Sequence, residues 1–445
     1  MARTVTAKKL LTKHVARADR VLLVNPPVEE TRYSWLRWNQ PLDLLTLGAY
    51  LKDKVGCSVE LFDCMKPNKD GDVPEEWLPR DRRYYTVQGE RYPMRRYGLS
   101  CNGLVDLVHQ WKARNPGSLP TQVWITSLCS YWYETVAEMC RVVRQALPDT
   151  QIVLIGQYPR LMPDHADTAC AADYLVTSAH DLTGTPHTLE LYGKDKPPFV
   201  AVQLHKKTAA VAVKAAVADG VYNVTLYEDD ICRDGGGLLT ELVSETRDLH
   251  KHLRYHLICG MDPAKFTPAL AKLIAEKTFA AVHFEEADRG DQVDMEVYKR
   301  VRGYLTDAGV KHNDDRFSGF VWIGRPGDQL EQLVLRTFQV LESLGSLILK
   351  PYTPTPGSPD HMANKKLLDS LSHREWSPHF FPFAELNGIT RQEYHDLYRM
   401  AAFLNEKVRA QAFNFLSGTL GAKLLRESLR KEVWKLEPSP FRVID

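Results

Sequence analysis

The chain has 445 residues, of which 44% are hydrophobic and 25% are charged, and its formal net charge is +1. These values are ordinary for a globular protein with two or three domains, and the balanced charge excludes no fold but favours neither nucleic acid nor an anionic membrane as a partner. No apolar run reaches the roughly 18 residues that a membrane-spanning helix needs.

Residues 1–19 form a basic segment with no acidic residue before Asp19. This composition is typical of a weak organelle-targeting segment or of a solvated amphipathic arm beside the first domain. We favour the arm. The segment lacks the apolar stretch of a secretory signal.

Strands and helices alternate over residues 20–180. Residues 20–26 form a short apolar run that ends at Asn25-Pro26-Pro27, which predicts a buried parallel strand. A helix is expected from about 42 to 54, ended by Gly56. Further strands are expected at 59–63, 123–127, 152–156 and 173–176, with a helix near 133–147. This alternation predicts a doubly wound parallel sheet with right-handed crossovers.

Ligands of such sheets bind at the carboxyl ends of the strands. The turns expected at that edge supply the candidate cofactor-binding residues. These are Asn25, Pro26, Pro27, Asp63, Ser127, Leu128, Gly156, Gln157, Tyr158 and Pro159, joined by Trp38 from the loop after the first strand. Aromatic residues near these turns either contact a large apolar cofactor or pack as ordinary core.

Residues 66–120 interrupt the alternation with prolines, glycines and a basic-aromatic stretch. Its tyrosines indicate an ordered insertion, and we expect a cap over a large cofactor. Single-stranded nucleic acid is the alternative ligand for such a stretch, and we do not favour it.

A linker is expected at 181–198, followed by a second α/β series over 199–360. Strands are predicted near 199–204, 223–227, 255–258, 281–284, 319–323 and 347–350. Helices are predicted near 206–219, 237–251, 266–277, 293–309 and 328–344. Six such units predict a partial (β/α)6 TIM-like barrel with its active face at the strand carboxyl ends. Residues 361–445 are predicted to be a C-terminal helical segment.

Several motifs, taken in order, resemble the cobalamin (B12)-binding radical S-adenosylmethionine (SAM) enzymes. The resemblance implies a Rossmann-like B12-binding domain over 20–180 and a radical SAM barrel over 199–360. The motifs are Asn25-Pro26-Pro27, the helix of residues 41–51, Ile125-Thr126-Ser127, residues 146–159, Asp173-Tyr174-Leu175-Val176, residues 224–230, residues 281–286, residues 323–328 and residues 352–359.

The chain departs from this family at the iron–sulfur cluster. The CxxxCxxC triplet that would hold a [4Fe–4S] cluster is absent, and Leu204 runs directly into His205-Lys206-Lys207 and an alanine-rich helix. The eight cysteines form no CxxC or CxxxC pair, so we interpret them as reduced, mostly buried thiols of a cytoplasmic protein. The family's Gly-Gly is Gly156-Gln157 here.

Without a cluster, the barrel has no electron source for reductive cleavage of SAM, whereas polar methyl transfer needs none. We therefore expect a cobalamin-binding protein that transfers a methyl group without radicals, with SAM as a second cofactor, or a cluster-less accessory. One alternative is a non-catalytic binding or regulatory partner of a complete radical SAM enzyme. Another is a B12-dependent radical SAM methyltransferase with an unusual cluster built from Cys232, Cys259 or others. The expected substrate is a small molecule or a peptide.

The candidate catalytic residues follow two predicted barrel strands: Asp229, Asp230, Glu285 and Glu286. The aspartates are alternatively helix caps, and a glutamate alternatively pairs with Arg289. His205-Lys206-Lys207 are positive and precede a helix, which suits a carboxylate or phosphate or simply a solvated helix start. His256 and His283 are expected in strands, as acid–base groups or as hydrogen-bonded core residues.

Overall fold

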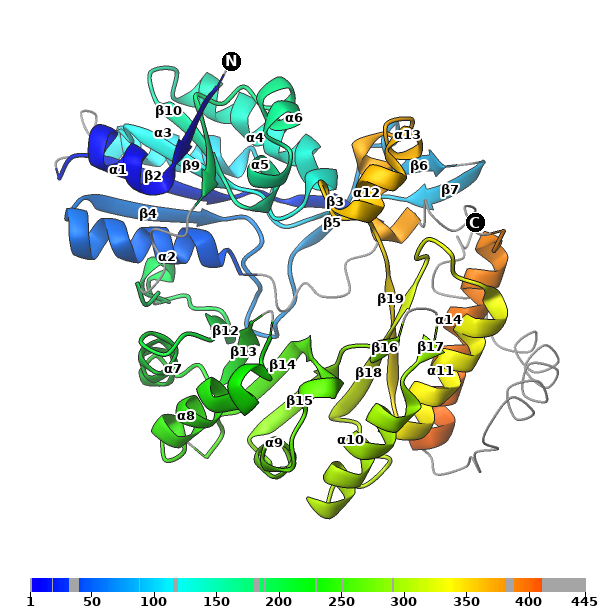
Figure 1. The fold of residues 1–445 in the computed structure, drawn as a ribbon. Helices are drawn as coiled ribbons and strands as arrows, with labels where there is room; N and C mark the ends of the chain where they lie inside the picture. The colour runs from blue at the N-terminus through cyan, green and yellow to red at the C-terminus, as the bar shows by residue number, and fades with distance from the viewer. Residues whose placement is uncertain are drawn as a thin grey trace. The chain divides into compact units, whose positions relative to one another are not determined.

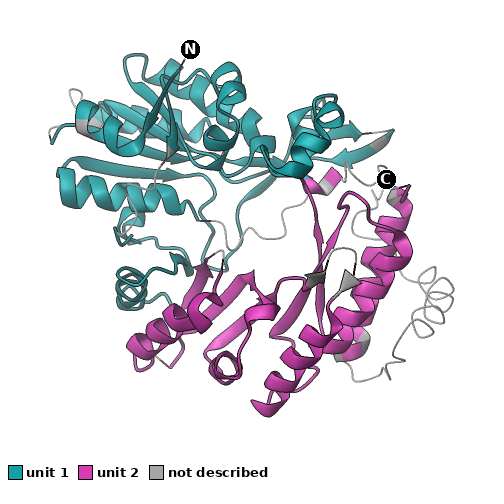
Figure 2. Cartoon of the chain, in the orientation of Figure 1, with its two compact units in different colours: residues 1–222, 355–377 teal, residues 223–354, 378–445 magenta. Residues whose placement is uncertain are grey.

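The protein is described by a computed structural model that covers residues 2–17, 19–31, 40–87, 89–114, 119–178, 185–187, 189–228, 230–249, 251–289, 292–380 and 388–409. The chain divides into two compact units (Figure 2). The first comprises residues 1–222 and 355–377, and the second comprises 223–354 and 378–445. Both units are mixed α/β, as expected. The predicted domain boundaries at 181–198 and 360 stay predictions.

The first unit is built on a six-stranded sheet in the order β1-β11-β10-β9-β2-β4, in which the paired strands run parallel (Figure 1). The strands are β1 (Arg3–Thr6), β2 (Arg20–Asn25), β4 (Ser58–Asp63), β9 (Gln122–Thr126), β10 (Gln151–Ile155) and β11 (Tyr174–Ser178). Without the edge strand β1, the spatial order is 2-1-3-4-5 by chain position, the order of flavodoxin-like sheets. The direction of winding therefore reverses at β2.

Both faces of this sheet are covered by helices because both faces of its strands are apolar. Leu22 packs in one core with Val123, whereas Leu23 packs in another with Trp124. The helices are α1 (Ala7–His14), α2 (Leu42–Tyr50) continued by a π-helical turn (Leu51–Val55), α3 (Gly103–Arg114), α4 (Tyr133–Ala146), α5 (Gln157–Leu161) and α6 (Pro163–Ala169). Gly56 ends the second of these in the left-handed conformation, as predicted.

The N-terminal arm contributes a strand that the sequence did not lead us to expect. Strand β1 pairs in parallel with β11, from Arg3 opposite Tyr174 onward. Helix α1 then buries Ala7, Leu10 and Leu11 against the sheet. The arm is therefore an edge strand followed by an amphipathic helix.

The insertion of residues 66–120 has regular structure of its own. It contains β5 (Glu75–Trp77), β6 (Tyr84–Val87), β7 (Glu90–Pro93), β8 (Arg95–Tyr97) and α3. Strands β6 and β7 form a hairpin, and β8 pairs antiparallel with both β5 and β3 (Val28–Glu30). The described part of this segment therefore consists of short strands and a helix, and its role as a cap over a cofactor stays a prediction.

A buried carboxylate, Glu29 on β3, joins three distant parts of the first unit. Its side chain is 2% exposed, with Arg96 Nη2 2.7 Å and Arg374 Nη2 3.3 Å from its oxygens. Arg82 is a third partner. The neighbouring Glu30 accepts a hydrogen bond of 2.7 Å from Ser377 Oγ. These contacts fasten both the insertion and residues 372–377 to β3.

The first unit also contains β12 (Phe199–Gln203) and α7 (Ala209–Ala218). Short helical segments complete it: Ser130–Trp132, Leu189–Tyr192, α12 (Pro359–Ala363), α13 (Lys365–Leu368) and His373–Trp376.

The second unit has five parallel strands in chain order. They are β13 (Asn223–Tyr227), β14 (Arg254–Met261), β15 (Phe279–Phe284), β18 (Phe317–Ile323) and β19 (Leu347–Pro351). The intervening helices are α8 (Gly237–Thr246), α9 (Pro268–Ile274), α10 (Met295–Asp307) and α11 (Leu330–Leu344), with α14 (Arg391–Arg409) last. A short ladder joins Asp288–Arg289 to Gln292–Val293, and 3-10 turns lie at Arg233–Gly236, Pro263–Lys265 and Pro378–Phe380. Residues 410–445 of the predicted helical segment lie outside the described residues.

The ends of α10 and α11 provide a matched test of packing in the second unit. Gly309 and Gly345 follow these helices with φ of +83° and +79°. A Cβ on Gly309 would meet no atom within 4 Å, whereas one on Gly345 would overlap the His312 carbonyl oxygen. We expect Gly309→Ala to lower the free energy of unfolding by roughly 1 kcal/mol, from backbone strain alone. Gly345→Ala should cost about 3 kcal/mol or more, because overpacking adds to the strain. Urea denaturation of both variants measures the difference, and equal midpoints would contradict the close approach.

Candidate functional site

The reversal of winding at β2 defines the first candidate edge, at the carboxyl ends of β2, β4 and β9. Asn25 Nδ2 donates to Asp63 Oδ1 at 2.8 Å, and the Tyr192 hydroxyl donates to Asp63 Oδ2 at 2.7 Å. Burial raises the pKa of Asp63, although these bonds oppose the shift. The structure thus brings Asn25 and Asp63 together, and each is already hydrogen-bonded within the protein.

A second carboxylate at this edge was missed by the sequence analysis. Asp43, at the start of α2, accepts a bond of 2.5 Å from Thr126 Oγ1 at the end of β9. Burial raises the pKa of Asp43. An aspartate in the first turn of a helix is typical of favourable interaction with the helix dipole. The position of Asp43 in the sequence therefore did not indicate its contact with Thr126.

The turns after β9 and β10 approach one another closely. Gly156 has a φ of +108°, and a Cβ there would lie 2.5 Å from the Ser127 carbonyl oxygen. The same carbonyl accepts a bond of 3.1 Å from the Tyr158 backbone amide. Leu128 is 45% exposed, and Gln157 is also exposed. These two side chains are the predicted cofactor-binding residues that present free surface on this unit.

The remaining predicted residues of this edge are interior. Pro26, Pro27 and Pro159 are buried, and Tyr158 is 1% exposed. The Tyr158 hydroxyl lies 2.7 Å from His165 Nδ1. Burial raises the pKa of Tyr158. Trp38 lies outside the described residues.

The aromatic residues near the end of β9 pack as core. Trp132 is 6% exposed and joins a small cluster with Val28, Met65 and Tyr97, against which Tyr131 is also packed. This cluster fills space beside the turn after β9.

The second candidate site lies on one face of the sheet in the second unit. Strand alternation and register place Trp322 opposite Lys350, and Glu285 follows β15. Trp322 Nε1 donates to Glu285 Oε2 at 3.2 Å, and Lys350 Nζ lies 3.4 Å from Glu285 Oε1. The ammonium is also 4.3 Å from the ring centroids of Phe320 and Trp322. A carboxylate, a cation and an aromatic face therefore meet here.

Glu285 keeps access to solvent, with 32% of its side chain exposed. It fits against β14 because Gly260, at φ +101°, has no side chain: a Cβ there would lie 2.6 Å from Glu285 Oε1. Lys350 is 35% exposed. These two residues have the geometry to contact a ligand.

Glu286 faces the opposite way and is 1% exposed. Its partners are Arg336 Nε at 3.2 Å and Arg325 Nη1 at 3.6 Å, and it accepts a bond of 3.1 Å from the Trp322 backbone amide. Arg336 also pairs with Asp328 at 3.1 Å. Burial raises the pKa of Asp328 despite these cations. Glu286 thus anchors residues 323–328, which resembled a family motif.

The aspartates after β13 are only partly described. Asp230 Oδ2 pairs with Lys265 Nζ at 2.6 Å, with Lys265 also 3.4 Å from Asp262. Asp229 lies outside the described residues.

His256 and His283 lie on neighbouring strands, β14 and β15. Burial lowers the pKa of His256 to about 4, with the proximity of His283 as a second cause. Burial also lowers the pKa of His283. Both rings are therefore neutral at pH 7, as hydrogen-bonded strand histidines are.

The described side chains that could bind a metal ion or a cluster are not grouped together. Within the part of the chain that the structure describes, no three His, Cys, Asp or Glu side chains are placed to hold a metal ion. Cys232 is buried and burial raises its pKa to about 12, whereas Cys259 is half-buried.

Among the described residues, no helix is long and apolar enough to cross a membrane.

Comparisons with known proteins bear on the fold. No protein-family model matches the chain, and no curated protein matches it. Among solved structures, the chain is similar to the radical S-adenosylmethionine methyltransferase TsrM from Kitasatospora setae, bound to tryptophan substrate and the SAM analog aza-SAM. The TM-score is 0.51 at 13% sequence identity, covering 76% of this chain and 75% of that one. The likeness supports the predicted fold class at this level: mixed α/β with parallel sheets.

The two adjacent glutamates give a test that separates anchoring from ligand contact. Glu286→Ala removes one of the two carboxylates that pair with buried Arg336 and the acceptor of the Trp322 backbone amide, so we expect a loss of about 3 kcal/mol in unfolding free energy. Glu285→Ala removes a half-exposed group and should change it by at most about 1 kcal/mol. Urea denaturation compares the two. A similar loss in both variants would contradict the assignment of the anchor to Glu286.

The lowered pKa of His256 predicts an acid-sensitive second unit. The folded pKa of about 4 lies below the ordinary value of 6.5, so the unfolded chain binds this proton first. Stability should therefore fall as the pH drops from about 6.5 towards 4. His256→Gln should weaken this dependence, whereas His252→Gln, at an exposed position, should retain it. Denaturation midpoints at pH 7 and pH 5 measure the effect; identical pH slopes for His256→Gln and the wild type would contradict it.

Proposed function

We propose that the protein binds cobalamin and takes part in methyl transfer without a [4Fe–4S] cluster. In this proposal the sheet of the first unit is a Rossmann-like B12-binding domain, and β12 with the strands of the second unit forms a partial radical SAM-type barrel. The observation that carries it is the 2-1-3-4-5 strand order with a ligand edge at its reversal. The missing cysteine triplet and the likeness to a radical SAM methyltransferase fold support the rest.

The residues of the first unit fit a cofactor along part of this edge. Exposed Leu128 offers apolar contact to a corrin ring, and Gln157, whose Oε1 accepts from Arg160, offers its amide nitrogen. The Asn25–Asp63 pair is occupied by its own hydrogen bonds and orients the turn after β2. Bound cobalamin supplies a metal centre that accepts and passes on a methyl group. The protein's part is to hold the ring and to exclude water from its face.

The second unit supplies a place for a methyl donor such as SAM, or for a small-molecule or peptide substrate. Glu285 accepts hydrogen bonds from an amine or hydroxyl group, Trp322 offers a ring face, and Lys350 pairs with an anionic group. The second cofactor is therefore assigned to this face of the sheet, with Glu285 as the contact residue and Glu286 as its support.

A non-catalytic binding role is the second candidate. It is favoured by the number of carboxylates already bound within the protein, namely Asp43, Asp63, Glu286 and Asp230. A partner enzyme would then supply the chemistry. Methyl transfer from SAM by the isolated chain would exclude this candidate.

Leu128 provides the test of cofactor binding. The chain, purified anaerobically and incubated with hydroxocobalamin, should retain corrinoid absorbance at about one equivalent. Leu128→Asp should weaken binding about tenfold or more, because a carboxylate would be buried against an apolar ring. Leu161→Asp, at an exposed leucine at the far end of α5, should bind as the wild type does.

Two outcomes would overturn the proposal. Absence of corrinoid absorbance at stoichiometric protein would remove the cofactor. Iron analysis after anaerobic reconstitution with iron and sulfide distinguishes the proposal from the radical SAM alternative. About four irons per chain would indicate a [4Fe–4S] cluster.

A further inference from the structure

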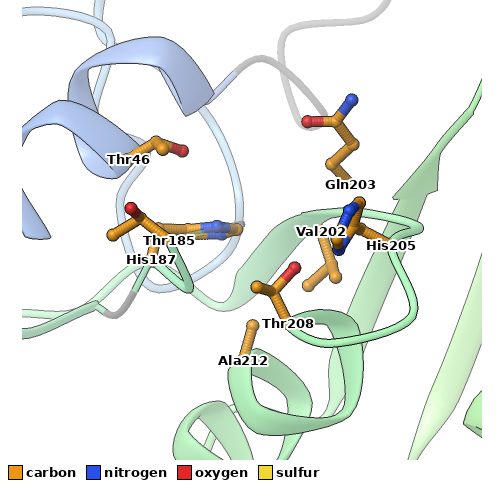
Figure 3. Close-up of a pocket in the computed structure, with 8 residues that line it drawn as sticks. All are labelled: Thr46, Thr185, His187, Val202, Gln203, His205, Thr208 and Ala212. Carbon is orange, nitrogen blue, oxygen red and sulfur yellow. The ribbon is translucent and has the colours of Figure 1, made fainter. Parts of the chain in front are cut away.

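A small pocket lies in the first unit between the end of β12 and the start of α7 (Figure 3). Its volume is ≈ 40 Å³. A water needs about 10–15 Å³ measured in this way, so the pocket has room for roughly three waters. It is too small for a corrin or for SAM. Its lining residues are Thr46, Thr185, His187, Val202, Gln203, His205, Thr208 and Ala212.

Thr208 contributes to the pocket a hydroxyl that has no hydrogen bond to any residue that the structure describes. Thr208 is 9% exposed and, although it precedes the first residue of α7, it makes no side-chain capping bond. Figure 3 shows its hydroxyl pointing away from the helix start into the pocket, on the side of Val202 and His205, with His187 across from it. This hydroxyl opens on the pocket, so a bound polar group can accept a hydrogen bond from it.

His187 supplies a hydrogen-bond acceptor to the same space. The residue is 6% exposed, and burial lowers its pKa, so the ring is neutral at pH 7. Nε2 lies 2.6 Å from the Ala201 carbonyl oxygen. Because a carbonyl only accepts, Nε2 carries the proton, and Nδ1 has a lone pair. A ligand that meets this nitrogen must bring a proton of its own.

The start of α7 supplies the complementary donors. The amides of Ala210 and Val211 have no acceptor within the helix because they lie in its first turn. No acidic residue occupies that turn, and exposed Lys206 and Lys207 precede it. The helix dipole and these charges favour an anion.

We infer that this pocket binds inorganic phosphate in a form that retains a P–OH group. That hydroxyl donates to His187 Nδ1, while the charged oxygens accept from the Thr208 hydroxyl and the first-turn amides of α7. A carboxylate suits the pocket less well, because it has no proton for His187. This site is separate from the proposed corrinoid edge and from Glu285.

The test uses the full chain without corrinoid or SAM, so its outcome is independent of the proposed function. Titration calorimetry with inorganic phosphate at pH 7 should show one saturable site. Thr208→Val removes the hydroxyl at nearly constant volume and should weaken binding about tenfold or more. Ala212→Leu fills the pocket and should abolish binding. Thr168→Val, whose hydroxyl bonds to Asp164 O outside the pocket, should bind as the wild type does.

Three results would overturn the inference. One is the absence of saturable phosphate binding to the wild-type chain. Another is unchanged affinity in both Thr208→Val and Ala212→Leu, which would place any binding on surface lysines. The third is displacement of phosphate by acetate at equal concentration, which would make the ligand a carboxylate.

Discussion

The parallel pairing of β2 with both β4 and β9 is the constraint on which the first unit depends. The chain can join two parallel neighbouring strands only by a crossover over one face of the sheet. Where one crossover covers one face and the next covers the other, the chain leaves the two strands in opposite directions. The turns after β2 and β9 therefore diverge at the carboxyl ends of these strands, and the backbone groups of both turns lie at that edge of the sheet. Glu29, just beyond β2, then fixes where the chain goes next, because a carboxylate that is 2% exposed must keep its arginines.

Continuous apolar strands could be predicted from the sequence, whereas short polar strands could not. Arg20–Asn25 and Gln151–Ile155 are buried on both faces, which leaves a clear apolar run. Strand β1 is mostly exposed and reads as a basic tail; its place is set by β11, about 170 residues away. Strand β8 is held by pairing with β3 and β5, and local sequence carries no signal of this pairing.

The candidate site residues show the same division. Sequence indicated that Glu285 and Glu286 end a strand, but two consecutive residues face opposite ways. Which one is buried depends on Arg336, fifty positions later. Lys350 was read only as part of a strand. Its contact with Glu285 follows from strand register, which pairs it with Trp322. The sequence predicted the edge of the sheet, and the tertiary partners decide which side chains remain available at it.

Availability also decides what chemistry each part of the chain can perform. A carboxylate that already accepts from Asn25 and Tyr192, or that balances Arg336, would have to lose those bonds to act on a ligand, at a cost comparable to the bonds themselves. Exposed Leu128 has no such bonds to lose, and Glu285 and Lys350, although bonded to one another, keep about a third of their side chains exposed. The Thr208 hydroxyl makes no capping bond to α7. Because Leu204 is followed so closely by α7, the short connection brings a helix start to the end of β12. The first-turn amides of a helix and a hydroxyl can hold an anion without any metal, so the short connection accounts for the anion pocket that we infer there.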